Sequence, residues 1–210
     1  MMIGLIAAGV LTLSGCSMGA SIEKQLSDTL IKMNDSEAEY EKNQTTLSDL
    51  EKTEQKLFGE TMELTKEDVD ELSKNVQELT TSTQDRLKHL ESEEASMDEA
   101  KKYINQLNKT ADDAGEEIKE KILELSTAAT ERYDLHASFT EQYRKLTSIQ
   151  QEFYELLEKK DVELATLQSK ADEINEQNTV VQSTIEQFNA KTKEVNNLKD
   201  ALFSSLEADE

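Results

Sequence analysis

Apolar residues recur along most of this chain at alternating spacings of three and four positions, which places them on one face of an α-helix. The pattern begins at Ile22 and divides into four runs, so it predicts four amphipathic helices. The apolar seam of the first run is formed by Ile22, Leu26, Leu30, Met33, Tyr40, Leu47, Leu50 and Leu57. Its end is expected at Phe58-Gly59, because Gly is common at helix C-termini.

The second run begins after Thr65-Lys66-Glu67-Asp68, where a hydroxyl residue and an acidic residue have the spacing of a capping box. Its seam is formed by Val69, Leu72, Val76, Leu79, Leu87, Leu90, Met97, Ala100, Ile104 and Leu107. The run is expected to end between Asn108 and Gly115, where polar residues and Gly replace the pattern.

The third and fourth runs are separated by Lys159-Lys160-Asp161. The lysines favour a helix C-terminus and Asp161 can cap the next helix, so we expect a turn there. The third seam contains Ile118, Ile122, Leu125, Ala129, Phe139, Tyr143, Leu146, Phe153 and Leu157, with Tyr133 and Ile149 widening it. The fourth contains Leu164, Leu167, Ala171, Ile174, Val181, Ile185, Phe188, Val195, Leu198, Leu202 and Leu206.

Helices of this length, up to about 45 residues or about 65 Å, must bury their seams on one another. Short connections make neighbours antiparallel, so we predict an all-α, long antiparallel four-helix up-and-down bundle with coiled-coil-like packing over residues 22–210. The alternative is a three-helix arrangement in which the last two runs fuse into one helix of about 90 residues. That helix would leave half of its seam unpaired in a monomer.

Composition agrees with an all-helical chain. The sequence has no Pro, no Trp and only 6 Gly, so the turn residues that sheets require are scarce. Aromatic residues make up 5% of the chain, which favours narrow apolar seams over a broad globular core.

The first residues have a different character. Residues 1–13 are uncharged and almost wholly apolar, and they are followed by Ser14, Gly15 and the only cysteine, Cys16. This predicts a signal peptide over 1–15, because the apolar segment is shorter than the ~20 residues that a membrane-spanning helix needs. Residues 16–21 are then expected to be a lipidated cysteine and a short tether without helical pattern.

Leu13-Ser14-Gly15-Cys16 resembles the bacterial lipobox. The resemblance implies transfer of diacylglycerol to the Cys16 thiol and cleavage just before it. Two acyl chains, at ~0.8 kcal/mol per buried methylene, hold a protein at a bilayer where one would be marginal. The alternative, a small apolar residue in an N-terminal helix, does not explain why the apolar run, the small residues and the sole cysteine coincide.

Charge limits the partners. The formal net charge is −22, and basic residues occur singly or in pairs beside carboxylates, so no basic patch for a phosphate backbone is visible. We therefore expect no nucleic-acid partner. A single cysteine also excludes a disulfide framework and a site with several cysteine ligands.

No pattern for catalysis or cofactor binding is found. Neither His89 nor His136 has a glutamate three positions before it, so the di-iron motif of helical bundles is absent. There is also no nucleophile elbow, phosphate-binding loop or zinc-protease motif. We predict that the chain is not an enzyme and holds no metal or cofactor.

One group of polar residues interrupts the seams of the second and third runs: Arg86, His89, Glu93, Arg132 and His136. If these helices pair antiparallel, Glu93 falls opposite Arg132, and His89 lies near the level of His136. We interpret the group as a polar layer that sets register, as buried polar residues do in coiled coils. A metal or ligand site is the less favoured interpretation, since two histidines lack a third ligand.

Several segments together are similar to one family. They are the signal and lipobox, Ile22–Leu30 (IEKQLSDTL), the Arg132-Tyr133 pair, the Tyr143–Tyr154 segment and the Lys160-Asp161 junction. This set resembles the YkyA-like lipoproteins of Gram-positive bacteria, which are called cell-wall-binding lipoproteins. The resemblance implies a four-helix up-and-down bundle and carries no catalytic or ligand residues.

These observations predict a non-enzymatic lipoprotein anchored by lipid on the extracellular face of the cell membrane. Its expected partner is a wall polymer such as peptidoglycan or, as the favoured alternative, another envelope protein, bound by helix faces. Two alternatives remain open: a structural spacer or scaffold for wall enzymes, and a carrier of a metal or small ligand that uses the polar layer.

Overall fold

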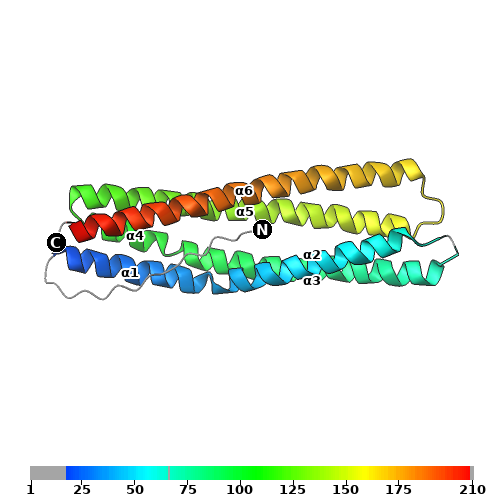
Figure 1. Cartoon of the computed structure of the whole chain (residues 1–210), viewed down its shortest axis with the longest axis horizontal. Helices are drawn as coiled ribbons and strands as arrows, with labels where there is room; N and C mark the ends of the chain where they lie inside the picture. Colours follow the sequence, from blue (N-terminus) through cyan, green and yellow to red (C-terminus); the bar gives the residue numbers. More distant parts are fainter. Residues whose placement is uncertain (1–17, 66, 209–210) are drawn as a thin grey trace. The chain divides into compact units, whose positions relative to one another are not determined.

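The structure is a computed structural model that describes residues 18–65 and 67–208. The predicted signal peptide and the lipobox residues Leu13, Ser14, Gly15 and Cys16 lie outside the described residues. The described chain forms α1 (Met18–Ser36), α2 (Ala38–Met62), α3 (Val69–Lys101), α4 (Ile104–Asp112), α5 (Glu116–Leu157) and α6 (Leu164–Ala208) (Figure 1). Every regular element in these ranges is an α-helix, which confirms the predicted fold class.

Two of the predicted runs are each divided into two helices. The first run breaks at Glu37, whose backbone N–H lies 3.1 Å from the carbonyls of both Met33 and Asn34. The second run breaks at Lys102-Tyr103, where the N–H of Lys102 donates to the carbonyl of Glu99 at 3.2 Å, three residues back. The seam spacing continues across both breaks, so periodicity alone does not show them.

Two expected boundaries and two seam assignments are wrong. Helix α1 begins at Met18, inside the segment expected to be a tether, and α2 continues past Gly59 to Met62. A glycine inside a helix costs only about 1 kcal/mol, so Gly59 does not end α2. Val69 and Leu164 were assigned to seams but are 55% and 69% exposed, because each is the first residue of its helix.

The two predicted turns are present. Asp68 Oδ2 accepts hydrogen bonds from the backbone N–H of Thr65 at 2.9 Å and from its hydroxyl at 2.7 Å, and these bonds lower the pKa of Asp68. Helix α3 starts at the next residue. Helix α5 ends at Leu157 and α6 begins at Leu164, so the three-helix alternative is wrong.

The chain divides into two compact units, which are described separately. Unit 1 consists of the described parts of residues 1–39, 95–137 and 185–210, and unit 2 consists of residues 40–94 and 138–184. Each unit contains parts of the four predicted runs: mainly α1, the end of α3 with α4, α5 and α6 in unit 1, and α2, α3, α5 and α6 in unit 2. The four-segment arrangement follows because each amphipathic segment can bury its seam only against the others.

Each unit has its own apolar core. In unit 1, residues with almost no exposed area include Leu26, Leu107, Ile122, Leu125 and Leu202. In unit 2 the core cluster is Val76, Leu79, Phe153 and Tyr154, with partly buried apolar residues of α2, α3, α5 and α6 packed around it. Most of the residues assigned to seams are therefore buried or partly buried.

Candidate functional site

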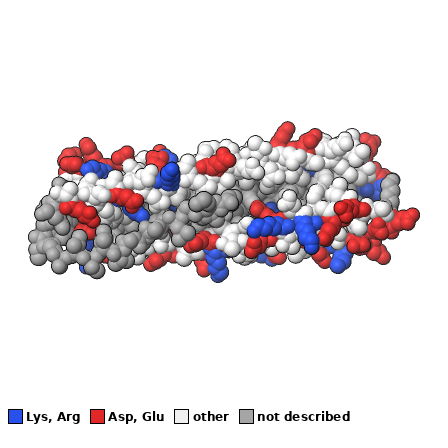
Figure 2. Space-filling model, in the orientation of Figure 1, with Lys and Arg blue, Asp and Glu red and all other residues white. Residues whose placement is uncertain are grey.

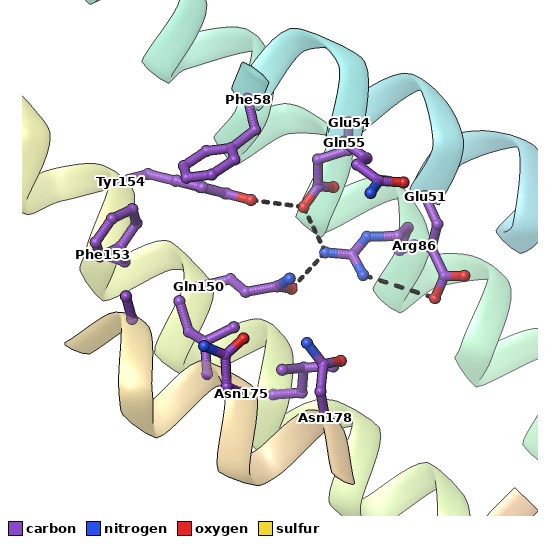
Figure 3. Close-up of a pocket in the computed structure, with 13 residues that line it drawn as sticks. Glu51, Glu54, Gln55, Phe58, Arg86, Gln150, Phe153, Tyr154, Asn175 and Asn178 are labelled. Carbon is purple, nitrogen blue, oxygen red and sulfur yellow. Dashed lines mark hydrogen bonds and ion pairs between the residues drawn. The ribbon is translucent and has the colours of Figure 1, made fainter. Parts of the chain in front are cut away.

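Arg86 of α3 is a buried cation in unit 2, with a relative exposure of 2%. Its Nη2 donates to Glu54 Oε1 at 2.8 Å and to Gln150 Oε1 at 2.6 Å (Figure 3). Its Nη1 donates to the Tyr143 hydroxyl at 2.9 Å. Its position follows from the seam, since Leu79, Arg86 and Leu90 share one face of α3. The helix spacing thus places a guanidinium where an aliphatic side chain is expected.

Two carboxylates of α2 complete this arrangement. Glu54 also accepts hydrogen bonds from the hydroxyls of Tyr154 and Ser82, both at 2.7 Å. Glu51 accepts one from the Tyr143 hydroxyl at 2.6 Å, and its Oε1 lies 4.0 Å from Arg86 Nη1. We call the set of Arg86, Glu51, Glu54, Tyr143, Gln150 and Tyr154 the Arg86 cluster.

The protonation states of the cluster follow from burial and pairing. Burial raises the pKa of Tyr143 and that of Tyr154, so both phenols stay protonated and donate. Burial opposes the charge of Arg86, but Tyr143 and Glu54 outweigh it and the pKa of Arg86 is raised. The cluster therefore contains a charged guanidinium and two neutral phenols that donate hydrogen bonds to Glu51 and Glu54.

A hollow of about 480 Å³ opens beside the Arg86 cluster, within the volume range of small-molecule sites. Its exposed edges belong to α2 and α6, and its buried floor belongs to α3 and α5 (Figure 3). The lining residues are Glu51, Glu54, Gln55 and Phe58 of α2, Arg86 of α3, Leu146, Gln150, Phe153 and Tyr154 of α5, and Ala171, Ile174, Asn175 and Asn178 of α6. We call it the unit 2 hollow.

One atom at the floor is unsatisfied. The Nε of Arg86 is buried and has no hydrogen-bond partner in the described part of the chain. A buried donor without a partner costs free energy, so this N–H can donate to a water molecule or a ligand oxygen that reaches it at the floor of the hollow.

Arg132 of α5 is the corresponding buried cation of unit 1. Its Nη1 and Nη2 donate to the two carboxylate oxygens of Glu37 at 2.7 and 2.8 Å, and its Nε donates to the Thr192 hydroxyl at 2.9 Å. The Tyr133 hydroxyl donates to Glu37 Oε1 at 2.6 Å. The guanidinium carbon also lies 4.9 Å from the centroid of the Phe188 ring. We call Arg132, Glu37, Tyr133, Thr192 and Phe188 the Arg132 cluster.

The Arg132 cluster is closed. The cavity beside it measures only about 20 Å³, which is close to the space of one water molecule. A bidentate carboxylate, a hydroxyl and an aromatic ring already occupy the faces of the guanidinium. This cluster has no room for a ligand.

The predicted polar layer is distributed over both units. Arg86, His89 and Glu93 belong to unit 2, whereas Arg132 and His136 belong to unit 1. His89 Nδ1 lies 2.8 Å from Asn43 Oδ1, and Glu93 is buried. The centroid of the His136 ring lies 5.6 Å from that of the Phe188 ring. The predicted opposition of Glu93 with Arg132, and of His89 with His136, stays a prediction.

Neither Glu37 nor Glu54, the carboxylate partners of the two arginines, was predicted from the sequence. Glu37 lies between the buried residues Met33 and Tyr40, and Glu54 lies seven positions after the buried Leu47. A glutamate at a seam position, where an apolar residue is expected, was the signal that could have predicted a buried ion pair. For Asn175 and Asn178 no such signal exists, since amides on a helix surface are ordinary.

Two further findings limit the chemistry. Within residues 18–65 and 67–208, no group of three His, Cys, Asp or Glu side chains is arranged to hold a metal ion. None of the helices described is both long and apolar enough to cross a membrane. Carboxylates are spread over the face seen in Figure 2, where the basic side chains lie beside acidic ones.

A family model described as "Putative cell-wall binding lipoprotein", the YkyA family, matches residues 21–205. The chain belongs to this family. The resemblance to YkyA-like lipoproteins is thereby confirmed. One relative, "Uncharacterized lipoprotein YkyA" of Bacillus subtilis (strain 168), is 26% identical over 204 residues, which cover 97% of this chain and 91% of the relative.

A solved structure supports the fold. A crystal structure of a conserved protein of unknown function from Staphylococcus aureus matches with a TM-score of 0.79. The match covers 90% of this chain and 97% of that chain, at 16% identity. It therefore shows a shared all-helical fold.

Proposed function

We propose that this protein is a non-enzymatic lipoprotein that is held on the outer face of the cell membrane by acylated Cys16 and binds a cell-wall component in the unit 2 hollow. Membership of a lipoprotein family and the lipobox ending in Cys16 support the anchor. The family description supports the wall as partner. The hollow beside the Arg86 cluster is the observation that carries the binding site.

The lining of the hollow supports binding over catalysis. Among the described lining residues the one hydroxyl is the buried Tyr154 phenol, which donates to Glu54 at 2.7 Å, and none of them is a Ser, Thr, Cys, His or Lys. The two carboxylates, Glu51 and Glu54, come from one helix, three residues apart. Glycoside hydrolysis needs carboxylates on opposite sides of the bond that is cleaved.

The anchor is tested by replacing Cys16 with Ser in the producing bacterium. The variant should lose labelled fatty acid and leave the membrane fraction, because no other lipid-attachment site is proposed. A variant that still fractionates with membranes would contradict the anchor.

Wall binding is tested by co-sedimentation of the purified protein with isolated peptidoglycan sacculi over a range of salt and calcium concentrations. Asn175 and Asn197 are both exposed amides of α6, but only Asn175 lines the hollow. We expect Asn175→Trp to abolish co-sedimentation by filling the opening, and Asn197→Trp to retain it. Binding that survives Asn175→Trp places the wall contact outside the hollow, and a wild type that never sediments rules out wall binding.

A further inference from the structure

The charges of the unit 2 hollow favour an uncharged ligand. Arg86 is already paired with Glu54 at 2.8 Å, and Glu51 accepts a hydrogen bond from Tyr143. An anionic ligand would be repelled by two carboxylates and would find a single cation that is already paired, on a chain whose net charge is −22. A cationic ligand would find only Glu51, whose side chain is 48% exposed and therefore attracts weakly through water.

The polar lining of the hollow suits hydroxyl groups. Four side-chain amides line it, those of Gln55, Gln150, Asn175 and Asn178. Each primary amide has two N–H donors and one carbonyl acceptor, and within the described residues the Gln150 carbonyl is the one that is already bonded, to Arg86. A hydroxyl is also both donor and acceptor, so a ligand with many hydroxyls can pair with amides on both walls.

Apolar groups lie among these amides. Phe58, Ala171 and Ile174 are partly buried residues on the walls, next to the buried rings of Phe153 and Tyr154. The Phe58 ring centroid lies 5.8 Å from that of Phe153 and 6.2 Å from that of Tyr154. A ligand made only of hydroxyls would leave this surface unused. A methyl group and the C–H face of a sugar ring would cover it.

The floor of the hollow is rigid. Glu54 is held by Arg86, Tyr154 and Ser82, and these contacts join three helices. Ligands bind more tightly to a preorganised site because fewer side chains lose freedom on binding. The floor thus provides a preorganised surface below the exposed amides Gln55 and Asn175.

From this lining we infer that the unit 2 hollow binds an uncharged saccharide that carries acetamido groups, which is the chemistry of N-acetylated wall glycan. The acetamido methyl contacts Ala171, Ile174 and Phe58, and the sugar hydroxyls and the acetamido N–H and carbonyl pair with the four amides. This inference rests on the proposed function and names its ligand class.

The test is a calorimetric titration of the purified full chain with short oligomers of N-acetylglucosamine, of glucosamine and of glucose. We expect N-acetylglucosamine oligomers to bind at least about tenfold more tightly than the other two, since these lack the acetamido group. Asn175→Trp should abolish binding and Asn197→Trp should not. Ala171→Leu, which fills the hollow from α6, should weaken binding without changing the helical circular dichroism spectrum.

The outcomes separate the ligand class from the function. Equal or tighter binding of glucosamine oligomers would overturn the assignment in favour of a cationic ligand, and equal binding of glucose oligomers would remove the role of the acetamido group. If no oligomer binds while sacculi still sediment in a manner that depends on Asn175, the ligand class is wrong and the proposed function stands. If sacculi do not sediment, the proposed function itself fails.

Discussion

Arg132 in unit 1 and Arg86 in unit 2 are both buried guanidinium groups that face a glutamate and a tyrosine, but their surroundings differ. Arg132 is held by both oxygens of Glu37, and the cavity beside it measures about 20 Å³. Arg86 contacts one oxygen of Glu54 and lies at the floor of a hollow of about 480 Å³. The same type of ion pair therefore lies in a closed core in unit 1 and at the floor of a hollow in unit 2.

The difference arises on α6. In unit 1 this helix buries Phe188, Thr192 and Val195 against its neighbours. In unit 2 it offers Ala171 and Asn175, which are too small or too polar to fill the same kind of space. The size of a few side chains on one helix thus contributes to whether a hollow lies beside a buried arginine.

The largest expected effect is the loss of the Glu37 carboxylate. Glu37→Gln leaves the buried charge of Arg132 without its counter-ion, so we expect the free energy of unfolding to fall by about 3 to 5 kcal/mol. Urea denaturation followed by circular dichroism measures it. Asp28→Asn, at an exposed position of the neighbouring helix α1, is the control and should change stability by less than about 0.5 kcal/mol. A loss for Glu37→Gln as small as that of the control would show that the Arg132 cluster is not closed.

Glu54→Gln should cost less, about 1 to 3 kcal/mol. Arg86 keeps its hydrogen bonds to Gln150 and Tyr143 and remains near Glu51, and the hollow admits water to the group left behind. The same denaturation experiment measures the difference between the two variants. Equal losses for Glu37→Gln and Glu54→Gln would remove the distinction between an open and a closed cluster.

The buried tyrosines predict a loss of stability at high pH. The pKa values of Tyr133 and Tyr154 are raised above the ordinary value of 10.0, mainly by burial. In the unfolded chain these phenols ionise near pH 10, whereas in the folded chain they do so only at higher pH. Their contribution is therefore fully present below pH 10 and falls above it, by about 1.4 kcal/mol per pH unit for each tyrosine.

Urea denaturation between about pH 9 and 11 checks this slope. Tyr133→Phe and Tyr154→Phe should each reduce it, because each removes one phenol that ionises first in the unfolded state. If only Tyr133→Phe reduces the dependence of stability on pH, the Tyr154 phenol ionises at the same pH in the folded and the unfolded chain. Contact with water in the hollow would be the reason.

The smallest expected effect is that of filling the hollow. Ala171→Leu adds a larger side chain where space exists, so stability should change by less than about 0.5 kcal/mol. The matched change Ala129→Leu adds the same atoms beside the small cavity of unit 1 and should cost about 1 to 3 kcal/mol through overpacking. Thermal denaturation of both variants measures the contrast. A large loss for Ala171→Leu would mean that the space beside Ala171 is not open.

Much of the fold could be predicted because a helix seam is a local property. Apolar positions three and four residues apart predict the helices, and Thr65 with Asp68 predicts the start of α3, since these contacts form between near neighbours in the chain. The same reasoning identified Arg86 and Arg132 as polar residues at seam positions, and both are buried. The breaks at Glu37 and at Lys102-Tyr103 were missed because they leave the spacing intact.

By itself the sequence determined the helical class, the seams, the turn between α5 and α6 and the family to which the chain belongs. Only the tertiary structure decided that Glu37 faces Arg132 and that Glu54 faces Arg86, and that a hollow of about 480 Å³ lies beside the second pair. The physical reason is that a hollow forms where side chains of several neighbouring helices are together too small to fill the space between those helices. The spacing of residues along a single helix does not show which side chains of other helices share that space.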